Sequence, residues 1–241
     1  MLSCLCPTYN RCGGPYQYLL EEAVESFLRQ YCSDTLLREL VILNDTPGQE
    51  VVCDAPRVRV VNLPYRLETL GDKRNLLVEL ARFEWLAPWD DDDISLPNRV
   101  QQACQQMHVQ QPDYWKPPQD WYLERGRKPQ WKHNVGYRHH SSVFTRAAWR
   151  AVGGYARTSG NEDALMDIAL MKLQHNIRTY PQGIPPSEWP YLYRWGVSPS
   201  HVSGNNDGKY EQRGEEPVAK GCFVLRPYWR QDYTELCRKE L

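Results

Sequence analysis

Long apolar runs are missing from this sequence of 241 residues. No stretch approaches the roughly 18 to 20 consecutive apolar residues that a membrane-spanning helix needs. The first residues, MLSCLCPTYN, also lack the charged start and long apolar segment of a secretory signal peptide. We therefore expect a soluble, intracellular protein.

An excess of either charge is missing as well. The 29 Lys and Arg nearly balance the 30 Asp and Glu, which leaves a net charge of −1. No global field would recruit nucleic acid or an acidic membrane. Apolar residues make up 41% of the chain, enough for a sizeable core, and no repeat or low-complexity segment interrupts it. We expect one continuous domain over residues 1–241.

CxxC pairs are absent, although the chain has eight cysteines. Without a secretion signal, reduced thiols are the expected state. A zinc site built from Cys4, Cys6 and Cys12 is an alternative that their spacing disfavours.

The first hundred residues alternate between strand-like and helix-like segments. Strands are predicted at 2–6, 39–45, 57–63 and 84–93, and helices at 16–31, 71–83 and 97–109. This alternation favours an α/β fold with a doubly wound, mostly parallel sheet. The second half is loop-rich. It holds a predicted helix at 161–174, with Leu165, Ile168, Ala169 and Leu173 on its apolar side, and a strand or hairpin arm at 190–196.

Polar clusters follow three of the predicted strands: PTYNR, NDTP and the four acids Asp90 to Asp93. The carboxyl ends of parallel strands meet at one edge of a sheet, where ligands bind. Four adjacent carboxylates repel one another, and a bound divalent cation would offset that repulsion. The alternative is a solvated acidic turn in which Asp93 caps the following helix.

Five segments in order resemble the family 2 glycosyltransferases with the GT-A fold, over roughly residues 1 to 175. They are CPTYNR, LVILNDTP, GDKRN, WDDDDISLPNR and GGY followed by NEDALMD. The resemblance implies a nucleotide-sugar-binding half at 1–110, and an acceptor-side half with a C-terminal tail at 111–241. Two departures stand out. Asn44-Asp45 replaces the family's usual acid pair, and Asp91 replaces a usual small residue.

The resemblance also assigns donor-binding roles. Pro7, Thr8 and Tyr9 would line the nucleotide pocket, and Asp45 would lie near the nucleobase. Arg74 would meet the diphosphate or the donor sugar.

The acid cluster matches the family's metal and sugar-diphosphate motif. Asp92 is the expected direct ligand of Mn²⁺ or Mg²⁺, and Asp90 the expected contact to the ribose or sugar and a second metal ligand. Asp91 joins the donor-binding set, where it either tightens metal binding or faces solvent. His201 is a candidate third ligand, because related folds often supply a C-terminal histidine. The adjacent His139 and His140 would face opposite ways in a strand and are disfavoured as a ligand pair.

Asp163 matches the general base of the family, and its place at a helix N-terminus would keep it ionised. Glu162 and Asp167 are the next candidates. The implied reaction is a metal-dependent single displacement with inversion, moving a sugar from a nucleotide diphosphate sugar, preferably a UDP-sugar, to an acceptor hydroxyl. No Ser-His or Cys-His arrangement calls for a covalent nucleophile.

The acceptor is left open between a saccharide and a hydroxylated nucleobase in DNA. Residues 125–157 contain eight Lys and Arg, no acid and several aromatics, so Lys128, Lys132 and Trp131 are acceptor-side candidates, together with Glu162 of the NED segment. Such a segment suits a phosphate-bearing acceptor such as hydroxymethylated DNA, the substrate of some phage-encoded relatives. The location would then be the host cytoplasm. The plainer interpretation is that these cations pair with acids and the aromatics fill the core or stack on sugars.

Two other functions are alternatives. A metal-dependent nucleotidyltransferase shares the sheet and the acidic motif, and PTYNRCGGP offers it Arg11 and two glycines. It leaves the NED helix unexplained. A nucleotide- or carbohydrate-binding module without catalysis would have lost the base or the metal acids, and both are present.

Overall fold

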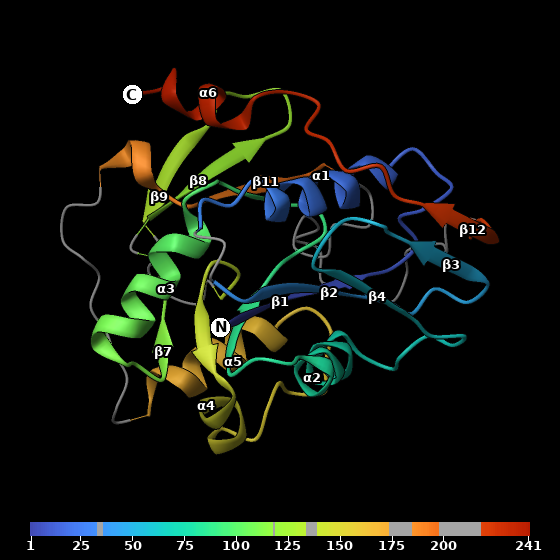
Figure 1. The fold of residues 1–241 in the computed structure, drawn as a ribbon, viewed down its shortest axis with the longest axis horizontal. Coiled ribbons are helices and arrows are strands. Elements are labelled where there is room, and N and C mark those ends of the chain that lie inside the picture. The colour runs from blue at the N-terminus through green and yellow to red at the C-terminus, as the bar shows by residue number, and fades with distance from the viewer. Residues whose placement is uncertain (33–35, 118, 134–138, 174–184, 198–217) are drawn as a thin grey trace.

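The computed structural model describes residues 1–32, 36–117, 119–133, 139–173, 185–197 and 218–241. Its centre is a six-stranded sheet (Figure 1). In spatial order the strands are β4 (Val58–Asn62), β2 (Arg38–Asn44), β1 (Leu2–Thr8), β5 (Trp85–Pro88), β10 (Val143–Thr145) and β7 (Tyr114–Trp115). The first four are mutually parallel, whereas β10 runs antiparallel to both of its neighbours. The predicted α/β class with a mostly parallel sheet is confirmed.

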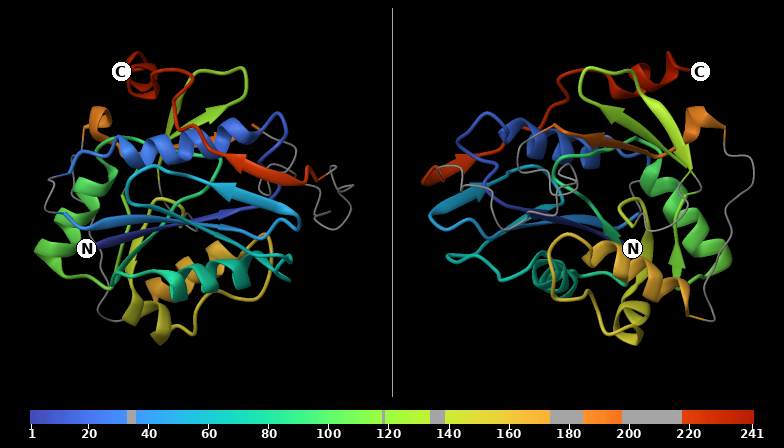
Figure 2. Two further views of the ribbon diagram at one scale, coloured as in Figure 1. Left: turned by 45° about the vertical axis from the view of Figure 1, so that its right-hand side comes forward. Right: turned by 180° about the vertical axis from the view of Figure 1, so that it is seen from behind.

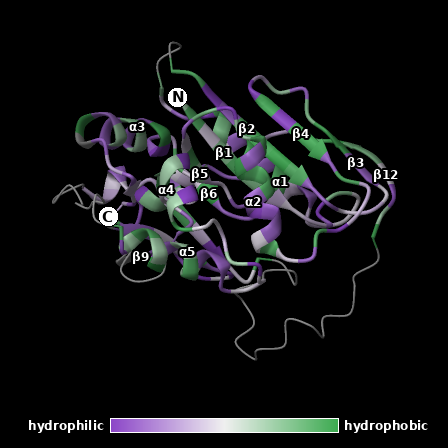
Figure 3. Cartoon of the chain, turned by 90° about the horizontal axis from the view of Figure 1, so that it is seen from below, coloured by the Kyte–Doolittle hydropathy of each residue, from purple (hydrophilic) through white to green (hydrophobic). Residues whose placement is uncertain are grey.

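Helices cover both faces of this sheet (Figures 1 and 2). One face packs on α1 (Gln17–Leu28) and α3 (Arg99–Gln110), and the other on α2 (Leu70–Leu80), α4 (Arg146–Ala151) and α5 (Glu162–Met171). Each face has its own cluster of buried apolar side chains. In Figure 3 the apolar colour concentrates on strands of the central sheet.

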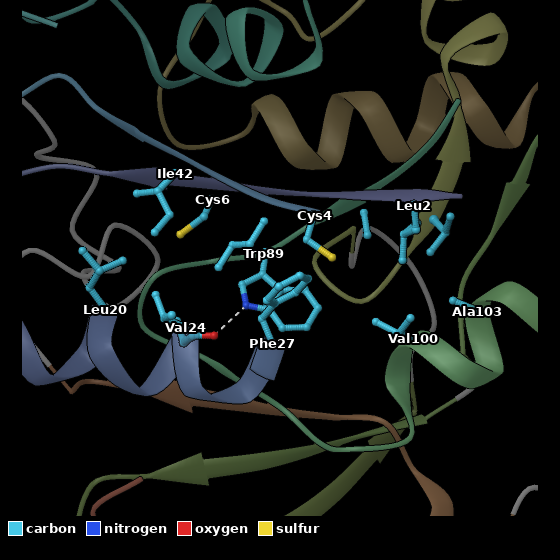
Figure 4. Close-up of a cluster of buried hydrophobic side chains, with 14 of the residues drawn as sticks. Leu2, Cys4, Cys6, Leu20, Val24, Phe27, Ile42, Trp89, Val100 and Ala103 are labelled. Carbon is cyan, nitrogen blue, oxygen red and sulfur yellow. Dashed lines mark hydrogen bonds between the residues drawn. The ribbon is translucent and has the colours of Figure 1, made fainter. Parts of the chain in front are cut away.

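The aromatic run ahead of the acids belongs to the core on the α1 face. Trp89 is 1% exposed, and its indole N–H donates to the Ala23 carbonyl at 2.9 Å (Figure 4). Its ring meets Phe27 edge-on at 6.0 Å. Cys4 and Cys6 point into the same cluster, and Cys12 is buried there too, so these thiols are packing residues.

Two smaller sheets complete the fold. The four-stranded one has the order β6 (Ile94–Ser95), β11 (Tyr191–Trp195), β8 (Gln119–Glu124) and β9 (Gln130–His133). It packs against α6 (Tyr233–Arg238) near the C-terminus, and η1 (Pro186–Glu188) leads into it. The third sheet pairs β3 (Gln49–Val52) with β12 (Gly221–Val224). No helix among the described residues is long and apolar enough to cross a bilayer.

The predicted elements exist, with shifted ends. The largest error is the predicted strand 84–93, because β5 ends at Pro88 and the acids lie in the turn before β6. The predicted helix 71–83 begins one residue earlier, where the Thr69 hydroxyl accepts from the Asp72 N–H at 3.0 Å. It ends at Leu80 because Ala81 is extended.

The predicted apolar side of the 161–174 helix is wrong. Leu165 is 41% exposed, whereas Met166 and Leu170 are buried. Glu162 lies on the same face as these two, at helical spacing, and is buried in an ion pair with Arg74. The buried ion pair therefore fixes the helix rotation, which an apolar pattern alone does not reveal.

Candidate active site

The four acids follow Pro88 at the carboxyl edge of the central sheet, and each has its own partners. The side chain of Asp90 is 19% exposed, that of Asp92 12% and that of Asp91 9%. Asp93 is buried. Asp90 is therefore the most accessible acid of the cluster, Asp91 and Asp92 are buried to nearly the same extent, and Asp93 is the most enclosed.

Asp91 is held by the loop that follows β1. Both of its oxygens accept from Arg11, at 2.9 Å from Nε and 2.8 Å from Nη2, and the Thr8 hydroxyl donates at 2.7 Å. Asn10, in the left-handed region at φ 50°, turns the chain between Thr8 and Arg11. The idea that Asp91 faces solvent is wrong, because it is buried against a guanidinium.

Asp92 shares that guanidinium. Arg11 Nη2 lies 3.0 Å from Asp92 Oδ2. Burial by itself lowers the pKa of Arg11, but Asp91 and Asp92 raise it further than burial lowers it, so the group is a permanent cation. The main-chain carbonyl of Asp92 accepts from Arg194 on β11, which fixes the backbone beneath the carboxylate.

Asp93 fastens the acid loop to β11. It accepts from the Tyr191 hydroxyl and from the Arg194 backbone N–H, both at 2.7 Å. Burial, and then the negative charges of Asp92 and Asp90, raise the pKa of Asp93 to about 7. The helix-capping alternative for Asp93 is wrong, since Asn98 precedes α3.

Arg74 joins the acid cluster to α5. From the second turn of α2 it donates to Asp90 at 3.0 Å and to Glu162 at 3.1 Å. Its pKa is raised, because Asp90 and Glu162 outweigh the burial that lowers it. Glu162 also accepts from the Gly160 N–H at 3.0 Å and is 2% exposed, so it is an anchor for Arg74.

Asp163 lies beside this bridge, half-buried in the first turn of α5, where its carboxylate accepts from the Ala164 N–H at 2.7 Å. Burial raises its pKa, and so does Glu162, while Arg74 and the Ala164 N–H lower it. The net shift is upward, so the expectation that the helix N-terminus dominates is wrong. A raised pKa brings a carboxylate closer to the range in which a general base is effective at neutral pH.

The candidate donor residues gather at the ends of β1 and β2. Pro7 and Thr8 are buried, and Tyr9 lies under the Arg66 guanidinium, 4.2 Å from its ring centre. Asp45 is 1% exposed. It forms an ion pair with Lys73 and accepts from the Leu67 N–H at 3.0 Å.

Lys73 also donates to the Thr8 carbonyl at 3.0 Å, so it connects the ends of β1 and β2. Burial lowers its pKa, and Asp45 opposes that shift.

Of the acceptor-side candidates, Glu162 is joined to Asp90 through Arg74, whereas Lys128 and Trp131 have their contacts elsewhere. Lys128 forms an ion pair with Glu240 at 3.1 Å near the C-terminus. Trp131 is 54% exposed, and its ring centre lies 6.1 Å from that of Trp189. Lys132 is on β9, but its side chain lies outside the described part of the chain, as does the whole of His201.

The adjacent histidines are not in a strand, yet they do face different surroundings. His139 is buried against Tyr155, whose hydroxyl is 2.8 Å from Nε2, and burial lowers the pKa of His139. His140 stacks on Tyr191, and its Nε2 lies 3.1 Å from Asp120.

Sequence reasoning missed the cations that organise the site. The sequence motifs gave Arg11 a role only in the nucleotidyltransferase alternative. They gave no role to Lys73 or Arg194. The available signal is position. Arg11 closes PTYNR, Lys73 precedes Arg74 in GDKRN, and Arg194 lies in YLYRWG. Buried acids require cationic partners, and each of these three cations lies in a segment that the sequence singles out.

The donor set fits a hard divalent cation. Carboxylate oxygens suit Mg²⁺ and Mn²⁺. Asp90 is the most exposed acid of the loop, whereas both oxygens of Asp91 are bound by Arg11 and Asp93 is enclosed. In the part of the chain that the structure describes, no three His, Cys, Asp or Glu residues form a ready-made metal site. The protein would therefore supply two carboxylates from this loop.

The family model described as "Glycosyl transferase family 2" matches residues 3–161. The fold and the acidic edge of the sheet agree with that match, and the chain belongs to glycosyl transferase family 2. No curated protein matches the sequence.

Solved structures with a similar fold include S. aureus TarS 1-349 in complex with UDP-GlcNAc, at a TM-score of 0.59 and 15% identity, over 85% of this chain and 61% of that one. TarS 1-349 with UDP gives a TM-score of 0.56 at 15% identity, over 80% and 60%. The mannosyltransferase PcManGT from Pyrobaculum calidifontis, with GDP-Man and Mn²⁺, gives 0.55 at 14% identity, over 83% and 58%. The chain thus has the GT-A fold and spans about 60% of the length of the TarS fragment.

Proposed function

We propose that this chain transfers a sugar from a nucleoside diphosphate sugar, preferably a UDP-sugar, to an acceptor hydroxyl with inversion at the anomeric carbon. The observation that carries the proposal is the bridge from Asp90 through Arg74 to Glu162. It ties the acid cluster, where a diphosphate would lie, to the first turn of α5, where Asp163 offers a base.

Each group then has a role. Asp92 and Asp90 hold a divalent cation, whose chemistry is to neutralise the charge of the departing nucleoside diphosphate. Asp163 accepts the proton of the acceptor hydroxyl while that oxygen bonds to the anomeric carbon. The bond from that carbon to the diphosphate oxygen breaks, and its electron pair leaves with the diphosphate. The nucleotide lies over the ends of β1 and β2, lined by Pro7, Tyr9 and Asp45.

Similar folds support the donor class. The TarS structures hold UDP or UDP-GlcNAc, and the mannosyltransferase holds GDP-Man with Mn²⁺. These bound ligands favour a nucleotide sugar donor over the substrate of a nucleotidyltransferase. A nucleotidyltransferase reaction would also leave Asp163 without a role.

The acceptor proposed is a saccharide, because aromatic rings line one side of the four-stranded sheet that contains β8 and β11. Asp93 joins this sheet to the acid loop. Tyr122 and Tyr193 stack at 5.9 Å between ring centres, and Trp195 lies 6.3 and 6.1 Å from them. All three are half-buried. Apolar ring faces with polar edges suit the C–H faces and hydroxyls of a sugar. The strand that carries Tyr193 joins the acid loop through Tyr191 and Asp93.

The basic segment supports the same choice over DNA. Arg127 pairs with Glu124 at 3.1 Å and Arg157 with Asp72 at 3.3 Å, so local acids compensate these cations. Arg146 donates to the main-chain carbonyls of Val78 and Ala81, and so serves the fold.

A donor and acceptor screen tests the proposal. UDP- and GDP-sugars are offered with Mn²⁺ or Mg²⁺ to mono- and oligosaccharides, and in a separate arm to hydroxymethylated DNA. We expect transfer to a saccharide, abolished in Asp92→Ala, with the anomeric configuration inverted. Asp54→Asn, in a loop outside the site, is the control and should keep full activity. Full activity in EDTA contradicts the metal role, and transfer to the DNA alone contradicts the acceptor class.

A further inference from the structure

We propose that Arg11 is a resident counter-cation of the acid cluster that competes with the divalent metal for Asp92, and thereby makes tight metal binding depend on the donor's diphosphate. The inference rests on the proposed function, because it concerns the metal of that site. It explains how the adjacent carboxylates Asp91 and Asp92 coexist in the protein before any ligand binds.

The contacts fix Arg11 in place. Its Nε and Nη2 bind the two oxygens of Asp91, which is the bidentate geometry of strong guanidinium–carboxylate pairs. The residue is 5% exposed, and Thr8 holds Asp91 from another side. Arg11 therefore has little freedom to withdraw when a metal arrives.

Asp92 is the shared group. The same Nη2 that binds Asp91 lies 3.0 Å from Asp92 Oδ2. A metal bound at Asp92 must either use the carboxylate beside this cation or displace it. Two positive groups on one carboxylate repel each other, and at this depth the interaction is only partly screened.

The charges indicate why the diphosphate matters. Asp90, Asp91, Asp92 and Glu162 face two guanidinium groups, Arg11 and Arg74, which leaves about two negative charges. A diphosphate alone is repelled by this negative region, and a divalent cation neutralises the region and removes that repulsion. Metal and nucleotide should therefore strengthen each other's binding, by the same factor in both directions.

Titration of the 241-residue chain with Mn²⁺, with and without UDP, tests this by calorimetry and by the electron paramagnetic resonance signal of free Mn²⁺. In Arg11→Gln we expect Mn²⁺ alone to bind at least about tenfold more tightly than in the wild type. The factor by which UDP strengthens Mn²⁺ binding should shrink. Arg11→Lys keeps the charge and should stay near the wild type. Arg82→Gln, which removes an exposed cation that is 3.8 Å from Glu39, should be unchanged.

A double variant separates the direct contact of Arg11 with Asp92 from the effect of net charge in the acid cluster. It also guards against misfolding. Arg11→Gln leaves Asp91 buried without its cation, whereas Arg11→Gln/Asp91→Asn removes both charges and still frees Asp92. We expect this variant to bind Mn²⁺ more tightly than the wild type, though less tightly than Arg11→Gln. Unchanged or weaker Mn²⁺ affinity in the folded variants overturns the role of Arg11. Absence of any UDP or GDP binding by the wild type, with or without Mn²⁺, instead overturns the proposed donor site.

Discussion

At the scale of single residues, the environment of each carboxylate decides its chemistry. Asp91 and Asp93 stand in the same run of letters as Asp90 and Asp92, yet a guanidinium and a tyrosine hydroxyl enclose them. Asp163 differs again, because burial and Glu162 raise its pKa although the residue is only half-buried. These differences predict how replacement of a given acid changes turnover, and Asp163 provides the test.

Asp163→Asn should lower turnover by about 10² to 10⁴, because the amide keeps the shape but cannot accept a proton. Nucleotide and metal binding should persist. In the wild type the base must be deprotonated, so turnover rises with pH through the pKa of Asp163. Because that pKa is raised, the acid limb of the pH–rate profile should lie above about 3.9, the value of an ordinary aspartate.

Steady-state rates with the donor and acceptor found in the screen check both expectations. Asp54→Asn is the matched control, and we expect it to leave both the turnover rate and the acid limb of the pH–rate profile unchanged. Turnover near the wild-type value in Asp163→Asn, or a product that keeps the donor's anomeric configuration, would contradict the assignment.

At the scale of elements, α2 and the segment before α5 are held in close contact. The Gly71 N–H donates to the Thr158 carbonyl at 3.0 Å, and a Cβ at Gly71 would lie 1.8 Å from the Ala156 carbonyl oxygen. Asn75, one turn further on, receives the Tyr155 N–H at 2.8 Å and donates to the Tyr155 carbonyl at 2.9 Å. The approach of this loop to α2 helps to place Asp163 opposite the acids.

Gly71→Ala should therefore force the loop away from α2. Overpacking of this kind costs about 1 to 3 kcal/mol of unfolding free energy, and turnover should fall more than nucleotide affinity. Urea denaturation and nucleotide calorimetry measure the two effects. Gly14→Ala is the control, since a Cβ there meets nothing within 4 Å. Equal stability of the two variants would show that the loop yields without cost.

At the scale of the whole molecule, one buried arginine joins distant parts of the chain. Arg194 on β11 binds Glu22 on α1 at 2.5 Å, the Tyr233 hydroxyl on α6 at 3.3 Å and the Asp92 carbonyl. Glu22 is fully buried and also accepts from Tyr233 at 2.8 Å. The C-terminal helix is thereby linked to the floor of the candidate active site.

Arg194→Met should lower the unfolding free energy by about 3 to 5 kcal/mol, because it leaves Glu22 buried without a cation. Arg194→Met/Glu22→Gln should recover much of that loss, since the amide is neutral and still accepts from Tyr233. Denaturation curves for both variants provide the measurement, with Arg82→Gln as a surface control that changes stability by less than about 0.5 kcal/mol. A double variant no more stable than Arg194→Met would show that packing, and not charge, dominates this site.

The sequence by itself determined the α/β class, the mostly parallel sheet and the edge at which the site lies. Strand–helix alternation and polar residues after strands are local patterns, and parallel strands place their carboxyl ends together. It also indicated the family, because the five motifs and their order can be read from the sequence alone. The proposed roles of Asp92 and Asp163 come from those motifs and await the measurements above.

Only the tertiary structure decided the partners. The Arg11–Asp91 pair spans 80 positions and the Arg194–Glu22 pair 172, and no local pattern specifies contacts at such separations. The same reason explains the misjudged rotation of α5, where a buried ion pair outweighs the apolar pattern. It also explains the raised pKa of Asp163, because burial and neighbouring charge are properties of the packed molecule.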